Sequence, residues 1–185
     1  DVDGIQFDEE MLGPDMNIIR KYDVNGSCTI VLKAPSHKIE FLPKSANNWL
    51  TIQTHYSVPI TNLEGLDSCN LSKVTKVIFE CPVQSLEHFP RSLNRPKVDV
   101  HFLNSLDNLR GIPSKFRANI EINQLRSFDG AKECDASGLV RINQAPTNLT
   151  GFFKSVSKLD SNIPEQDLER HRNYQEINKR LPELD

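Results

Sequence analysis

The sequence predicts an α/β solenoid, in which the chain winds into stacked turns that each contribute one short parallel strand. A degenerate repeat of roughly twenty residues runs from about residue 36 to residue 156, a period typical of stacked-repeat proteins. Each repeat ends in a short run of alternating apolar and polar residues, the pattern of a half-buried strand. Proline and glycine lie between these runs so often that long helices are excluded there.

The repeat is defined by apolar residues spaced three apart, often followed by proline. One column of the repeat holds Ile39, Leu66, Leu86, Leu109, Phe128 and Phe152, whose successive spacings are 27, 20, 23, 19 and 24 residues. This column predicts five to six repeats within residues 36–157. An unrelated β-rich fold with several short strands is the alternative.

One strand is expected in each repeat. The expected strands are residues 49–52, 77–79, 98–102, 120–122 and 139–142. Stacked side by side they would form a parallel sheet along one face of the solenoid. Parallel neighbours need a crossover connection, and the irregular loops that carry the leucine and proline positions would provide it.

These elements resemble leucine-rich repeats of the short kind found in bacterial and phage proteins. The resemblance rests on Leu-x-x-Leu, Ile-Pro-x-x-Phe and Ile-x-Ile elements and covers about 120 of the 185 residues. The side chains at the asparagine-ladder place of that family would be Asn62, Asn148 and Gln124, with Ser85 and Ser105 in other repeats. The resemblance implies a curved solenoid that binds a protein partner through its strand face and carries no cofactor.

The two ends of the chain differ from the middle. Residues 1–15 form an acidic N-terminal arm, and residues 16–35 are expected to be a hairpin cap because Asn25-Gly26 is a strong two-residue turn signal. Residues 158–185 predict a C-terminal helix with an N-cap at Ser161-Asn162. Its apolar stripe either caps the last repeat or binds a partner: Leu168, His171, Tyr174, Ile177 and Leu181.

Composition excludes several classes of protein. No apolar run approaches the length of a membrane span, and basic residues do not cluster with aromatic residues as in nucleic-acid-binding proteins. The four cysteines lack the paired spacing of a zinc site; two disulfides are arithmetically possible, but buried thiols are favoured. We therefore expect a cytoplasmic or virion-associated protein rather than a secreted one. Because the chain begins at Asp1 without Met, we also expect a processed product or an excised domain.

The sequence contains no catalytic motif. The five histidines are scattered, and neither a nucleophile elbow nor a phosphate-binding glycine loop is present. We therefore expect a non-catalytic protein without a metal or cofactor.

The outward positions of the expected strands are the candidate binding residues, because alternate residues of a strand point to opposite faces. They are Thr51, Gln53, Asp99, His101, Glu121 and Arg141. This row is polar and mixed in charge, as in a specific protein interface. Two functions follow: a recognition module that binds a protein partner through this face, or a structural component of a virion or multi-subunit assembly that associates through its terminal segments. The oligomeric state stays open.

Overall fold

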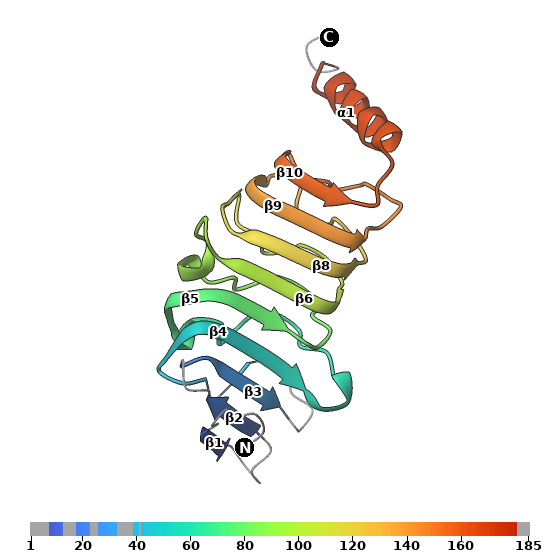
Figure 1. Ribbon diagram of the computed structural model, residues 1–185. Coiled ribbons are helices and arrows are strands. Elements are labelled where there is room, and N and C mark those ends of the chain that lie inside the picture. The colour runs from blue at the N-terminus through green and yellow to red at the C-terminus, as the bar shows by residue number, and fades with distance from the viewer. Residues whose placement is uncertain (1–7, 13–17, 23–25, 33–38, 41, 181–185) are drawn as a thin grey trace.

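The protein is a β-solenoid of about six turns with parallel strands and one C-terminal helix. The computed structural model describes residues 8–12, 18–22, 26–32, 39–40 and 42–180. Its strands stack side by side into one long sheet, with β1 at one end and the helix α1 beyond β10 at the other (Figure 1). Among the described strands, β7 alone lies off this continuous path, where it pairs with β9.

The sheet joins ten strands in the order β1-β2-β3-β4-β5-β6-β8-β9-β10, plus β7. Their bounds are β1 Asp8–Leu12, β2 Ile18–Tyr22, β3 Cys28–Leu32, β4 Ser45–Thr54, β5 Asn70–Phe79, β6 Asp99–Leu106, β7 Lys115–Phe116, β8 Asn119–Leu125, β9 Asp135–Gln144 and β10 Ser155–Ser161. The helix α1 spans Glu165–Arg180, and three 3-10 helices span His55–Ser57, Leu66–Ser68 and Arg91–Leu93. All five expected strands are confirmed, whereas β7 and β10 were not expected. Because β10 extends to Ser161 and α1 begins at Glu165, the first residues of the segment 158–185 are a strand rather than a helix.

Helical structure in the crossovers is limited, within the described residues, to the three-residue 3-10 helices, and the single α-helix lies at the end of the chain. The fold is therefore a β-solenoid, and the α/β class expected from the sequence is not confirmed. The physical reason is the density of proline and glycine in the crossovers, which leaves no crossover segment long enough to form an α-helix.

The core lies between the sheet and the crossovers. Alternation sends apolar side chains inward from each strand, and the parallel register stacks them in columns. The rings of Phe79 and Phe102, which are register partners on β5 and β6, stack with centroids 4.9 Å apart. Full burial of each such side chain stabilises the fold by about 1.5–3 kcal/mol. The columns pair as Leu50 with Val77 and Val100, and Ile52 with Phe79 and Phe102.

A tight turn recurs in five repeats of the described part of the chain and fixes their register. The amide of the fourth residue donates to the carbonyl of the first, as from Leu66 to Leu63 at 3.1 Å and from Ile112 to Leu109 at 3.1 Å. The third residue has a positive φ, which favours glycine. It is Gly65, Gly111, Gly130 and Gly151 in four turns and His88 in the remaining one.

This turn corrects the column chosen from the sequence. The equivalent first residues are Leu63, Leu86, Leu109, Phe128 and Leu149, so Leu66 and Phe152 belong to the fourth position instead. Ile39 belongs to the same position, because its amide donates to the Glu64 carbonyl just as the Leu63 amide donates to the Glu87 carbonyl. With Ile39 included, the spacings between successive first residues become 24, 23, 23, 19 and 21 residues. The repeat is more regular than the leucine spacing alone indicated.

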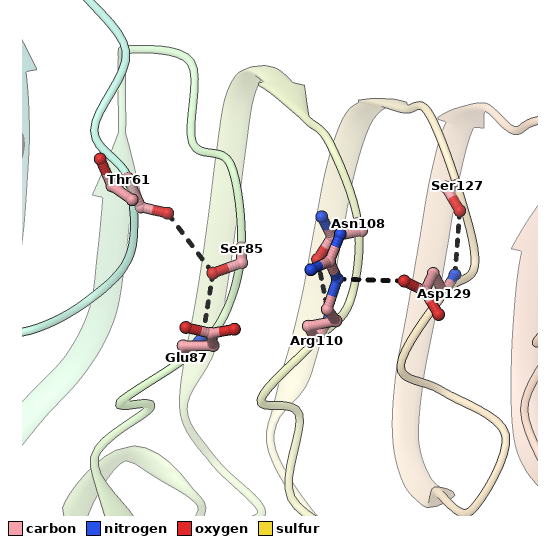
Figure 2. A network of polar contacts seen from close by, with 7 residues as sticks. All are labelled: Thr61, Ser85, Glu87, Asn108, Arg110, Ser127 and Asp129. Carbon is pink, nitrogen blue, oxygen red and sulfur yellow. Dashed lines mark hydrogen bonds and ion pairs between the residues drawn. The ribbon is translucent and has the colours of Figure 1, made fainter.

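A polar side chain precedes each turn and caps it (Figure 2). Its side-chain oxygen accepts a hydrogen bond from the backbone amide two residues later. The Arg110 amide donates to Asn108 Oδ1 at 3.0 Å, and the Asp129 amide donates to Ser127 Oγ at 3.0 Å. The same position holds Asn62, Ser85 and Asn148 in the other turns. The assignment of Ser105 and Gln124 to this position was wrong, because both lie inside strands.

Most of these caps act within their own turn rather than forming a continuous ladder. Ser85 is the exception, because its hydroxyl also donates to the Thr61 carbonyl of the preceding turn at 3.4 Å (Figure 2). Successive turns are joined instead by backbone bonds, such as Leu86 amide to Arg110 carbonyl at 2.8 Å. The exposed pair of Arg110 Nε and Asp129 Oδ2, 3.0 Å apart, adds a side-chain link.

The N-terminal end of the sheet is antiparallel. Strands β2 and β3 pair with Tyr22 opposite Cys28, as expected for the hairpin; the expected turn at Asn25-Gly26 falls partly outside the described residues. Strand β1, within the segment expected to be an acidic arm, adds to the outer side of β2.

The C-terminal helix contacts the last turn through its first half. Leu168 is 5% exposed, and the His171 ring meets the Phe152 ring edge-on with centroids 5.7 Å apart. The side chains of Tyr174, Ile177 and Leu181 lie outside the described residues, so the rest of the expected stripe stays a prediction.

All four cysteines are buried, as the sequence favoured. Burial raises the pKa of the Cys81 thiol to about 12 and that of Cys134 to about 11. These thiols are therefore protonated at neutral pH and pack as small apolar groups.

The repeated turn gives a matched pair of substitutions. In Gly111→Ala the new Cβ would lie 2.4 Å from the Glu87 backbone at a φ of 90°, so we expect destabilisation by more than about 1 kcal/mol. His88→Gly, at the equivalent turn position, should change stability by less than about 1 kcal/mol, because relief of left-handed strain offsets the greater entropy of the unfolded chain. Urea unfolding midpoints measure both; equal effects would contradict the proposed turn geometry.

Candidate functional site

The outward face of the sheet brings four of the six expected binding residues into one row. The parallel register places Thr51 opposite Ile78, Ile78 opposite His101, His101 opposite Glu121, and Glu121 opposite Arg141. The row then continues to Asp160 on β10. All these side chains except Asp160 are partly buried by their neighbours.

The other two expected residues lie in flanking rows. Asp99 has Lys76 and Asn119 as register partners, and the same row begins at Trp49 on β4. Gln53 lies two residues beyond Thr51 and donates a hydrogen bond from Nε2 to Glu80 Oε2. The six residues therefore share a face but form three rows rather than one.

Sequence reasoning missed several residues of this face. Ile78 is outward although it sits in the continuous apolar run 77–79, where the alternation signal is hidden. Lys76 lies in the second half of β5 and Asn119 begins β8, and each comes one residue before the bounds expected for its strand. Asp160 belongs to β10, a strand without an apolar alternation strong enough to predict it.

A shallow hollow of about 230 Å³ lies in the middle of this face, over strands β5 to β9. Four expected residues line it together with the missed Lys76 and Asn119. The full lining is Lys76, Asp99, His101, Asn119, Ile120, Glu121, Leu139 and Arg141.

His101 and Glu121 form the central polar contact of the hollow. His101 Nδ1 lies 3.2 Å from Glu121 Oε2. Nevertheless the pKa of His101 is lowered, because burial of the ring and the nearby Lys76 cation outweigh the carboxylates of Glu121 and Asp99. At neutral pH the contact therefore joins a neutral imidazole and a carboxylate. The tautomer that carries its proton on Nδ1, toward the carboxylate, leaves Nε2 as an acceptor.

Asn119 joins three adjacent strands across the hollow. Its Nδ2 donates to Asp99 Oδ1 on β6 at 2.9 Å, and its Oδ1 accepts the Leu139 amide of β9 at 2.9 Å. Because both ends of the amide are used, its orientation and that of the Asp99 carboxylate are fixed.

The two cations of the hollow are held by groups at its rim. Arg141 Nε lies 2.9 Å from Asp160 Oδ2. Lys76 Nζ stands over the Trp49 ring, 4.7 Å from its centroid, although Asp99 is its register partner.

Apolar side chains run diagonally beside the hollow. Trp49 and Leu103 are 50% and 52% exposed, and Ile78 lies between them. Ile78 lies on the strand next to that of Trp49 and two residues beyond its register partner, a diagonal step of about 7–8 Å. Leu103 stands in the same relation to Ile78. We call these three residues the apolar diagonal.

Other kinds of site find no support in the described part of the chain. No group of three or more histidine, cysteine or acidic residues there is arranged to hold a metal ion. No helix among the described residues has the length and apolar character needed to cross a membrane.

Comparison with known proteins adds no family assignment. No protein-family model, curated protein or solved structure matches the sequence.

Removal of the bridging amide tests the geometry of the hollow. We expect Asn119→Ala to lower the free energy of unfolding by about 1–2 kcal/mol, because it leaves a carboxylate and an amide without their partner. Asn123→Ala on the same strand is the control: Asn123 is exposed, and its loss should cost less than about 0.5 kcal/mol. Chemical denaturation measures both, and an equal cost would argue against the bridge.

The lowered pKa of His101 predicts a pH dependence of stability. As pH falls below 6.5, the value for an unperturbed histidine, the unfolded chain binds a proton before folded His101 does, so stability declines. His101→Gln should therefore lose less stability than the wild type between about pH 7 and pH 5. Denaturation at both pH values measures the difference, and parallel losses would count against a neutral, partly buried His101.

Proposed function

We propose that the protein is a non-catalytic recognition module that binds a protein partner through the outward face of its sheet. The observation that carries this proposal is the apolar diagonal, with Trp49 and Leu103 half exposed beside a hollow of fixed polar groups. Large apolar side chains that stay exposed next to one another on a folded surface are typical of interaction sites. Tryptophan is also among the residues most often dominant in binding energy.

The rigidity of the face supports this function. The strands are hydrogen-bonded to neighbours on both sides from β2 to β9, and Asn119 and Arg141 are held by side-chain bonds. A surface that is already ordered loses little conformational entropy when a partner binds. The mixed charges of the hollow would then set specificity and association rate more than affinity.

The repeat type belongs to the same proposal. We infer a leucine-rich-repeat-like solenoid, because each turn combines a leucine-type residue, a polar cap before it and one short parallel strand. That type of repeat implies protein binding at the strand face without a cofactor.

Nucleic acid and membrane are not the proposed partners. The outward face carries carboxylates at Glu80, Asp99, Glu121 and Asp160 among its cations, and this pattern is unlike a basic stripe that follows phosphates. The buried cysteines are consistent with a reducing compartment, such as the cytoplasm, which agrees with a cytoplasmic or virion-associated protein.

A structural role in a virion or multi-subunit assembly is the second candidate. It is favoured by strand β10, which among the described residues pairs only with β9 and so presents one edge of its backbone. Such an edge is a template for pairing with another chain. In this case the terminal segments, rather than the outward face, would carry the contacts.

Site-specific photo-crosslinking distinguishes the two candidates. A photoreactive amino acid replaces Thr51 on the outward face, Thr150 in the turn of the last repeat, or Ser157 on β10, and the full chain is cross-linked in an extract of its native source. We expect a stoichiometric foreign protein to be trapped from position 51 and not from position 150. Trapping only from position 157, especially of a second copy, would support the assembly role instead.

Substitutions then test the energetic role of the face. With the cross-linked partner purified, Trp49→Ala combined with Leu103→Ala should weaken binding by at least about 30-fold, since a dominant interface residue contributes about 2 kcal/mol or more. Arg126→Ala, an exposed residue on the opposite, turn-bearing side, is the control and should leave the dissociation constant unchanged. Titration calorimetry measures all three proteins, and an unchanged affinity in the double variant would refute the proposal.

A further inference from the structure

Within the described part of the chain, the two carboxylates of the hollow have no Lys or Arg partner. Among the described residues, Asp99 accepts a hydrogen bond from the neutral amide of Asn119, and Glu121 Oε2 lies 3.2 Å from Nδ1 of His101. Neither forms an ion pair with Lys76 or Arg141, although both cations line the same hollow. Two carboxylates on adjacent strands are therefore held in place by neutral groups.

The two cations are directed to the rim instead. Lys76 stands over the Trp49 ring rather than beside Asp99, and Arg141 is paired with Asp160. An anionic group that entered the hollow would have to compete with Asp160 for Arg141 and would meet two carboxylates. A cationic group would find the carboxylates of Asp99 and Glu121 and the acceptor nitrogen Nε2 of His101 available together.

We propose that the hollow receives an arginine or lysine side chain of the protein partner, next to the apolar residues with which that partner covers the apolar diagonal. This inference rests on the proposed function and adds the chemistry of the partner. The occupant is thus a segment with a basic residue beside large apolar ones. Charge complementarity with Asp99 and Glu121 selects it over an acidic segment.

The shape of the hollow agrees with such a side chain. The half-buried Leu139 contributes to its lining, and the methylene stem of an arginine or lysine packs well on apolar surface while its charged end reaches acceptors. Three acceptors from β6 and β8 suit the fork of a guanidinium, which donates several parallel hydrogen bonds. Arginine is therefore the better fit of the two.

A probe pair that differs only in charge tests this inference directly. N-acetyl-L-arginine N-methylamide is titrated into the isotope-labelled full chain, and the amide signal of Leu139 and the side-chain amide of Asn119 are followed by NMR. The control probe is the corresponding citrulline compound, which has nearly the same shape and no charge. We expect the arginine probe to shift both signals and the citrulline probe to bind at least tenfold more weakly. Equal binding of the two probes, or no binding of either, would overturn the inference.

Isosteric variants localise the effect. Asp99→Asn and Glu121→Gln remove charge and keep shape, and each should weaken the arginine probe at least tenfold. Asp129→Asn, on the turn-bearing side and paired with Arg110, is the matched control and should bind the probe as the wild type does. Loss of binding in the control as well would mean that general surface charge, rather than the hollow, attracts the probe.

The outcome separates this inference from the proposed function. If photo-crosslinking from position 51 traps a partner but the arginine probe does not bind, the face is an interface and the hollow does not select a basic side chain. If the probe binds and no partner is trapped from the face, the hollow is a cation-selective site whose occupant is not a protein. An N-acetyl-glutamate N-methylamide that binds more tightly than the arginine probe would reverse the sign of the partner and refute the inference.

Discussion

The close approach of successive turns at the repeated tight turn is the constraint on which the rest of the structure depends. At Gly111 and Gly130 the preceding turn lies so near that a Cβ would fall 2.4–2.5 Å from its backbone atoms. This approach lets the backbone of one turn bond that of the next, which sets the register of the whole stack. Because the register is shared, an inward residue in one turn stacks on an inward residue in the next, and the apolar columns of the core follow.

The outward face is a consequence of the same register. Side chains that are 20 or more residues apart in the sequence become neighbours across strands, as Asp99 and Asn119 do. The strands are fixed on their inner side by the core, so the outward side chains are free to differ from turn to turn without loss of the fold. This separation of a repeated core from a variable surface explains how a regular solenoid carries one specific hollow, with apolar residues on β4, β5 and β6 beside it.

Electrostatics on this face is decided by pairing rather than by composition. Lys76 and Arg141 would neutralise Asp99 and Glu121 if charges simply met their nearest opposites. Instead the indole of Trp49 and the carboxylate of Asp160 hold the two cations at the rim. The hollow consequently contains equal numbers of cations and carboxylates, yet its available groups are acceptors. The lowered pKa of His101 fits this arrangement, because a neutral imidazole adds one more acceptor.

The sequence by itself determined the solenoid, five of its parallel strands and the inward or outward direction of most of their side chains, because alternation and period are local properties of the chain. It also placed all six expected residues on the outward face. Only the tertiary structure decided which of them are neighbours. Irregularities within β4, β6 and β10 shift the pairing, and crossovers differ in length from turn to turn, so the rows cannot be counted from spacing alone. The roles of Ile78, Asn119 and Asp160 also depend on how the strands align, because each of these residues acts through contacts with residues far away in the sequence.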